Sequence, residues 1–300
     1  MTWRKLGLVF TPSSRHPALA SHAALPVAAP FSSDLVRVFY SGRDERSRSS
    51  IGSVVIRLAN QPQVEDAPPE PILRPGLAGA FDDSGLGVGS IVRGETEDRL
   101  YYMGWNVGGS VPWRNAIGLA TGSIEYGRFE RFSVGPIMDR DTVDHYSLSY
   151  PWVLNTAPGA WTMWYGTHLA WGAEKADMSH AIRRATSTDG LTWMRNPTVV
   201  LGPEGDDIAV VRPSVLATKE GFQMWFARRG HGPYGLAHAV SPDGILWRRT
   251  HVAMPGTDDG GWENGATTYP GAFTHAGRLW LLYNGDGYGA TGFGLAVWEE

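Results

Sequence analysis

Short runs of β-branched and aromatic residues, separated by turn residues, recur along this 300-residue chain at a nearly constant interval. Each repeat begins at a proline or glycine, which we call its anchor, and successive anchors are 63, 62, 62 and 57 residues apart: Pro26, Gly89, Pro151, Pro213 and Pro270. Self-similarity at a fixed period indicates a repeat architecture. Strand-rich repeats of this length are typical of four-stranded propeller blades. We therefore predict an all-β fold, a five-bladed β-propeller of antiparallel strands that forms a single domain over residues 1–300.

The second strand of each repeat carries the clearest signal, an aromatic and aliphatic run: 36–40, 100–103, 161–165, 222–226 and 279–283. In the third and fourth repeats, the fourth strand follows an Asp-Gly pair, Asp189-Gly190 and Asp243-Gly244. Such a pair favours a tight turn because glycine accepts the positive φ that these turns need. We therefore interpret both aspartates as turn formers and not as catalytic groups.

The fifth repeat stops just after its third strand, at Trp298-Glu299-Glu300. The missing strand is predicted at the other end of the chain, because Trp3-Arg4-Lys5 matches the fourth-strand pattern Trp247-Arg248-Arg249. Without that strand, the last blade would expose an open sheet edge. We expect residues 2–10 to pair beside residues 293–298 and so to complete blade five.

Composition narrows the classes of function. With 42% hydrophobic residues, 13 Trp and 11 Tyr, the chain has ample apolar surface for a folded core. The absence of cysteine excludes disulfides, a thiol nucleophile and thiolate metal sites. No signal peptide and no run of ~20 apolar residues is visible, so a cytoplasmic protein with no membrane partner is expected. The net charge of −4 argues against nucleic-acid binding, and no obligate protein partner is evident.

Antiparallel order places the start of each first strand at the same face as the end of the second and the start of the third. Acids lie seven residues before four of the five anchors: Asp82, Asp144, Asp206 and Glu263. The first repeat has Leu19 there, with His22 close by. A ring of acids around one axis would suit a polar ligand pocket. Asp and Asn before a strand also shape loops through their own backbone, so each single acid stays open to either interpretation.

The repeats, with the motifs at 187–193, 241–247 and 39–44, resemble the five-bladed propeller glycosidases: the arabinanase and xylosidase family, the invertase and levansucrase group, and the mannoside phosphorylases. Similar hydrolases place a base or nucleophile carboxylate in blade one, an acidic pKa modulator in blade two and a general acid in blade three. This chain has His22 in blade one and no glutamate in residues 144–151 of blade three. Asp82 or Asp83 could fill the second position. The two-carboxylate pair therefore does not transfer residue by residue.

The first hypothesis is a carbohydrate-active enzyme, a glycoside hydrolase or glycosyl-transferring enzyme, with a sugar or sugar-like substrate in the axial funnel. Its expected catalytic residues are Asp83, Glu263, His22, His145 and Asp144. Its expected substrate-binding residues are Arg43, Trp105, Tyr146, His168, Asp207, Arg212, Arg229 and Asp286. If His22 replaces a carboxylate, its titration should change activity or binding near pH ~6–7.

Other functions remain open. A propeller that has lost catalysis would bind a glycan or another small polar ligand. A phosphorylase, or an enzyme with a charged substrate, would use Arg43, Arg228 and Arg229, since arginine binds phosphate or carboxylate through two parallel hydrogen bonds. No cofactor is expected. His22, His145 and the acids could supply ligands for a divalent metal at the axis, but no compact metal motif is present.

Overall fold

The protein is built almost entirely of β-strands, as predicted. The computed structural model describes residues 2–13, 16–171, 178–258 and 260–299. These residues include one 3-10 turn, η1 (Pro17–Leu19), and one short helix, α1 (Asp286–Gly289). Their strands form one four-stranded sheet and two eight-stranded sheets.

Each eight-stranded sheet consists of two antiparallel four-strand groups joined by one parallel bridge, Ser49 to Gly85 or His180 to Ala209. We number the strand groups in chain order. Group one is β2 (Ser21–Pro30), β3 (Leu35–Arg43), β4 (Ser49–Arg57) and β5 (Gln63–Asp66). Group two is β6 (Gly85–Val92), β7 (Asp98–Val107), β8 (Trp113–Ser123) and β9 (Arg128–Arg131). Group three is β10 (Leu148–Ala157), β11 (Ala160–Ala170), β12 (Ser179–Ser187) and β13 (Met194–Leu201). Group four is β14 (Ala209–Thr218), β15 (Gly221–Arg229), β16 (Gly235–Ser241) and β17 (Arg248–Arg249). Group five is β18 (Thr268–His275), β19 (Arg278–Asn284), β20 (Phe293–Glu299) and, from the other end of the chain, β1 (Thr2–Phe10).

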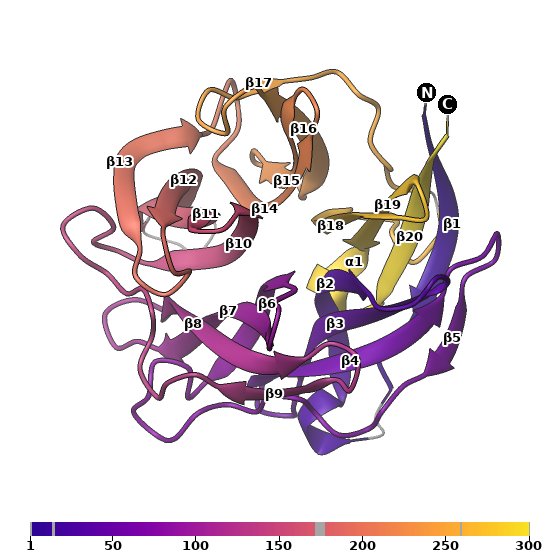
Figure 1. Cartoon of the computed structure of the whole chain (residues 1–300), viewed down its shortest axis with the longest axis horizontal. Coiled ribbons are helices and arrows are strands. Elements are labelled where there is room, and N and C mark those ends of the chain that lie inside the picture. The colour runs from indigo at the N-terminus through magenta and orange to yellow at the C-terminus, as the bar shows by residue number, and fades with distance from the viewer. Residues whose placement is uncertain (1, 14–15, 172–177, 259, 300) are drawn as a thin grey trace.

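The first strands of the groups surround a common centre (Figure 1). They contact one another in cyclic order: β2 with β6, β6 with β10, β10 with β14, β14 with β18, and β18 with β2. Side chains near the start of these strands are therefore brought together from groups that are far apart in the sequence.

The N-terminal strand completes group five, which confirms the predicted pairing. β1 runs antiparallel to β20, with Thr2 opposite Glu299 and Trp3 opposite Trp298. Both termini lie at the same edge of the molecule (Figure 1). The Trp3 ring packs edge-on against Trp298 at 5.1 Å and against Trp225 of group four at 6.4 Å. β1 therefore joins two neighbouring groups as well as covering a sheet edge.

An aromatic side chain on the fourth strand, or on the residue directly before it, packs against the second strand of the preceding group at four of the group boundaries. The pairs are Phe129–Phe39, Trp193–Tyr101, Trp247–Trp164 and Trp3–Trp225, with ring centroids 5.6, 6.2, 6.1 and 6.4 Å apart. Such pairs contribute about 0.5–1.5 kcal/mol beyond the area they bury. The same contact recurs around the ring and fixes each outer strand to its neighbour.

The two Asp-Gly pairs form turns, as predicted. Asp189 Oδ1 accepts hydrogen bonds from the backbone N–H groups of Leu191 and Thr192, each at 2.8 Å. Asp243 Oδ1 accepts the equivalent pair from Ile245 and Leu246. These carboxylates are occupied in shaping their own turns, at the opposite end of the strands from the starts of the first strands.

Replacing Trp3 by alanine is expected to lower the free energy of unfolding by about 3–5 kcal/mol, because Trp3 is buried between two groups. Denaturant unfolding followed by tryptophan fluorescence measures this. The control is Met194→Ala, at a side chain that is 75% exposed, where a change within about 0.5 kcal/mol is expected. Equal losses in the two variants would show that closure by β1 contributes little.

Candidate functional site

Asp144, a predicted catalytic acid, is buried in a dense set of polar contacts. It is 1% exposed, and its carboxylate accepts hydrogen bonds from Tyr165 Oη and Thr167 Oγ1, both at 2.7 Å. Arg183 Nη1 lies 2.8 Å from Oδ1, and Arg195 Nη1 lies 3.2 Å from Oδ2. Arg195 belongs to β13, so the acid ties the loop before the first strand to the fourth strand.

The same arrangement, which we call the acid clamp, occurs in groups two to five. It pairs an acid before the first strand with a basic residue two positions after the fourth-strand aromatic. The pairs are Asp82–Arg131 at 2.8 Å, Asp144–Arg195 at 3.2 Å, Asp207–Arg249 at 2.6 Å and Glu263–Lys5 at 2.7 Å. In group four the clamp uses Asp207, and the aligned Asp206 is exposed.

Group one carries neither half of the clamp. Leu19 takes the position of the acid and packs in the same apolar cluster as Tyr40. On β5, Asp66 stands two residues after Val64, where the other groups have Arg or Lys. Group one therefore lacks both the acid and the base of the clamp, which is expected if the two form a structural ion pair. The clamp explains the repeated acids and gives Asp144, Glu263 and Asp207 a structural role that needs no ligand.

Two other predicted carboxylates are free of ion pairs with the described residues. Asp83 is half-buried, and it accepts hydrogen bonds from the Gly79 N–H and Ser84 Oγ, both at 2.9 Å. Asp286 is also half-buried and accepts from the backbone N–H groups of Gly265 and Ala266 at 2.7 and 2.9 Å. Both therefore shape loops on the face where the first strands begin.

The remaining predicted residues lie on that face but do not form one constellation. His145 and Tyr146 are exposed, with ring centroids 4.4 Å apart. Trp105 donates from Nε1 to Ser49 Oγ at 2.9 Å and so fastens group two to group one. His168 is buried against His180, with ring centroids 4.1 Å apart.

His22 differs from its predicted behaviour. It is half-buried at the start of β2, and its Nδ1 lies 3.0 Å from Ser21 Oγ. Burial and the nearby Arg43 guanidinium lower the pKa of His22 to about 4. The imidazole is therefore neutral throughout the neutral range, and the expected pH step near 6–7 is wrong for this residue.

The residues immediately before three anchors form the centre of the site. Tyr150, Arg212 and Tyr269 have left-handed φ values of 49°, 57° and 51°, and the strand register shifts at each of them. Non-glycine residues in such conformations cost on the order of 1–3 kcal/mol each. Leu25, before the anchor Pro26, has the same conformation with a φ of 57°, so the left-handed residue before the anchor is a feature of the repeat in four groups. The cyclic contact of the first strands brings them together: the Tyr150 and Tyr269 rings lie 5.9 Å apart.

Tyr234, just before β16, and Tyr288, in α1, extend this group. Their rings lie 6.2 Å apart, and Tyr288 lies 6.1 Å from Tyr269. The Arg229 guanidinium lies 5.5 Å from the Tyr234 ring centroid. We call Tyr150, Arg212, Tyr234, Tyr269 and Tyr288 the axial cluster.

Sequence reasoning identified Arg212 and Arg229 but missed the four tyrosines. A signal was present for two of them, because Tyr150 and Tyr269 precede their anchor prolines as Arg212 precedes Pro213. No such signal marked Tyr234 or Tyr288. These two join the cluster from a third-strand loop and a short helix.

Arg212 is fully buried at the base of the axial cluster. Its Nη1 donates to the carbonyl oxygens of Val88 and Gly89, at 3.0 and 2.8 Å, and these belong to β6 in group two. Its Nε and Nη2 are buried without a hydrogen-bond partner. Burial lowers the pKa of Arg212 to about 10, so the side chain keeps its charge at neutral pH. A buried guanidinium without a paired carboxylate is costly and calls for a functional explanation.

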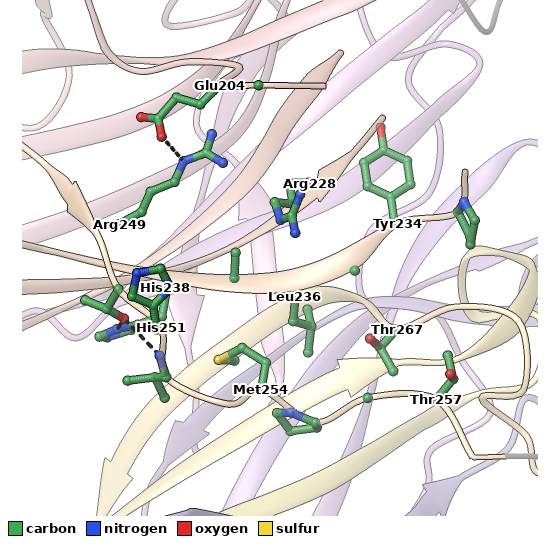
Figure 2. Close-up of a pocket in the computed structure, with 18 of the residues that line it drawn as sticks. Glu204, Arg228, Tyr234, Leu236, His238, Arg249, His251, Met254, Thr257 and Thr267 are labelled. Atoms are coloured by element: carbon green, nitrogen blue, oxygen red, sulfur yellow. Dashed lines mark hydrogen bonds and ion pairs between the residues drawn. The ribbon is translucent and has the colours of Figure 1, made fainter. Parts of the chain in front are cut away.

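A cavity of about 750 Å³ adjoins the cluster between groups four and five. Figure 2 shows Tyr234 on one side of it and Arg249 with Glu204 on another, with Leu236 and Met254 between them. Its volume falls in the range of small-molecule sites, and its lining mixes apolar and polar groups. A smaller cavity of about 370 Å³ lies near Phe81, Asn106 and Arg140. None of the predicted catalytic residues lines either cavity.

The described part of the chain contains no group of three or more His, Asp or Glu residues placed to hold a metal ion. It also contains no helix that is long and apolar enough to span a membrane.

Comparison with known proteins gives relatives along the whole chain. No protein-family model matches it. The chain is 45% identical to the uncharacterized proteins MT1551 and Rv1502 of two Mycobacterium tuberculosis strains, and each alignment covers 100% of both partners. The chain belongs to their family.

Solved structures show what fold this family has. A glycoside hydrolase superposes with a TM-score of 0.74 at 15% identity, covering 99% of this chain and 91% of that one. A thermostable family-43 glycoside hydrolase gives 0.69 at 13% identity, with 93% and 91% covered. A protein from work on the GH130 family of mannoside phosphorylases gives 0.68 at 15% identity, with 100% and 90% covered. The family therefore has the propeller fold of glycoside hydrolase-like proteins, and at these identities the likeness is one of fold.

The acid clamp predicts a loss of stability when a clamp acid is neutralised. Asp144→Asn should lower the free energy of unfolding by about 3–5 kcal/mol, because Arg183 and Arg195 lose their buried carboxylate. The matched control is Asp83→Asn, which removes a carboxylate without an ion pair and should cost less than about 1 kcal/mol. Denaturant unfolding of both variants measures the difference, and comparable losses would contradict the clamp.

The buried histidines predict a pH-dependent stability. Burial and Arg229 lower the pKa of His180 to about 4, below the unfolded value of about 6.5. The unfolded chain therefore binds more protons, and the free energy of unfolding should fall as the pH drops from about 6.5 to about 4, by about 3 kcal/mol for His180. Denaturant titrations at several pH values should show a smaller fall in the free energy of unfolding for His180→Gln than for the unchanged protein. The control, His251→Gln, replaces an exposed histidine and should show the same fall as the unchanged protein. Identical slopes in all three proteins would contradict this.

Proposed function

We propose that the protein is a five-bladed propeller, one blade per strand group, that binds a carbohydrate or sugar-like ligand at the face where the first strands begin. Five groups of four strands and the cyclic contact of their first strands support the blade count. The carbohydrate class follows from the fold shared with glycoside hydrolases.

The observation that carries this proposal is the axial cluster. Four tyrosines converge there, and three of them, Tyr150, Tyr269 and Tyr288, have left-handed backbone conformations. Aromatic rings with hydroxyl groups offer apolar faces for sugar rings and hydrogen-bonding edges for their substituents. The adjoining cavity of about 750 Å³ extends from Tyr234, so a ligand larger than one sugar has space on this face.

Binding without ordinary glycoside hydrolysis is the better-supported form of this function. Glycosidases need two carboxyl groups on either side of the scissile bond. In this protein four acids before the first strands are engaged in clamps, and group one contributes Leu19 and His22 in place of an acid.

A hydrolase, phosphorylase or transferase is the second candidate. Asp83 and Asp286 favour it, because they lie on the same face, are half-buried and form no ion pair within the described ranges. Turnover of a glycoside that is lost in Asp83→Asn and in Asp286→Asn would establish this alternative.

Screening the protein on a glycan array, followed by calorimetry with the best ligands, tests the proposal. We expect a sugar to bind and Tyr288→Ala to weaken its binding at least ~5-fold, which corresponds to the loss of about 1 kcal/mol of apolar contact with the aromatic ring. Tyr126→Ala is the control, since Tyr126 is 73% exposed on the β8–β9 turn, at the other face. Absence of any sugar binding, or equal effects of the two substitutions, would contradict the proposal.

A further inference from the structure

We propose that the axial cluster recognises an anionic group, a phosphate or a carboxylate, carried by the sugar-like ligand. The inference rests on the proposed function and names the substrate class of the same site.

Arg212 supplies the first argument. The guanidinium is 0% exposed, and two of its three nitrogens have no hydrogen-bond partner. Buried donors of this kind are rare in native proteins because each loses its water without compensation. The third nitrogen is bound to carbonyl oxygens of another group, which holds the charge in place at the centre of the ring.

The charged residues around the axial cluster supply the second argument. Two further arginines lie near this face: the charge of Arg229 lowers the pKa of His180, and the charge of Arg43 lowers the pKa of His22. Arg229 also lies over Tyr234. No carboxylate among the described residues is paired with Arg212. Four of the acids before the first strands are held by clamp bases, and Asp83 and Asp286 accept hydrogen bonds from their own loops. The Arg212 guanidinium packs on the Trp152 ring, 5.6 Å from its centroid, and so keeps its charge without a carboxylate partner.

The phenol groups of Tyr150 and Tyr269 supply the third argument. Tyr150 and Tyr269 are half-buried beside the fully buried Arg212. Burial raises the pKa of Tyr150 to about 12 and that of Tyr269 well above its usual value, so both hydroxyls stay protonated. The two hydroxyls are hydrogen-bonded to each other, which leaves one of them free to donate. An anion would accept that hydrogen bond at the accessible rim of the cluster, and the Arg212 charge beneath would attract it across a medium of low dielectric constant.

A neutral sugar fits this chemistry less well. Each of its hydroxyl protons needs an acceptor, whereas the guanidinium offers only donors. Phosphate and carboxylate are negatively charged and mainly accept hydrogen bonds, which matches the charge of the buried Arg212 and a phenol donor at the rim. The shared chemistry also admits free inorganic phosphate as a separate ligand, so the test includes it.

The experiment measures calorimetric affinities for glucose, mannose and galactose, for their 6-phosphates and uronates, and for inorganic phosphate. We expect at least one anionic sugar to bind at least ~10-fold more tightly than its neutral parent, with an affinity that falls as salt rises. Arg212→Met, which is similar in length but uncharged, should reduce this preference below ~2-fold. Arg212→Lys, which keeps the charge, should retain most of it.

Circular dichroism and thermal unfolding establish that each variant is folded. If Arg212→Met does not fold, Tyr150→Phe combined with Tyr269→Phe is measured in its place, because it removes both hydroxyls and with them the donor offered to the anion, and it should reduce the preference at least ~3-fold. Survival of the full preference in the folded Arg212→Met protein, or in the double tyrosine variant, would overturn the inference.

The ligand panel separates the two proposals. If neutral sugars bind as tightly as their anionic relatives, the proposed sugar binding stands and the anion site fails. If inorganic phosphate binds as tightly as the sugar phosphates, the anion site stands and the sugar-binding proposal fails. If no member of the panel binds, both are overturned.

Discussion

The attachment of each fourth strand to the rest of the ring is the constraint on which this structure depends. In groups two to five an aromatic residue at the fourth strand packs on the preceding group, and two positions later a basic residue binds an acid from the loop before the first strand. In group five both residues come from the N-terminal strand, as Trp3 and Lys5. The same short pattern therefore positions the outer strands and closes the ring.

This constraint also decides the chemistry that remains for the central face. A propeller could use the acids before its first strands as ligands, but here four of them neutralise bases on the outer strands. The axis is left to Arg212 and tyrosines, which makes it a region of positive charge and hydrogen-bond donors.

The axial cluster carries costs that packing alone does not explain. Four of its residues adopt left-handed backbone conformations, and one of these, Arg212, is a buried guanidinium with two unpaired nitrogens. Strain and unpaired polar groups of this kind lower the free energy of unfolding. They persist because neighbouring strands fix the backbone on both sides, and a ligand that accepts hydrogen bonds would offset part of the cost.

The repeat period, the Asp-Gly turns and the truncated last repeat are local patterns, so the sequence alone determined the all-β class and the pairing of residues 2–10 with the C-terminal strand. The position of Arg212 was predictable too, because it precedes an anchor. The role of the acids was not, since Asp144 and Arg195 are 51 residues apart and Lys5 and Glu263 are 258 apart. Likewise, the low pKa of His22 comes from burial and Arg43. Charge pairing and desolvation depend on distances between distant segments, and only the tertiary structure sets those distances.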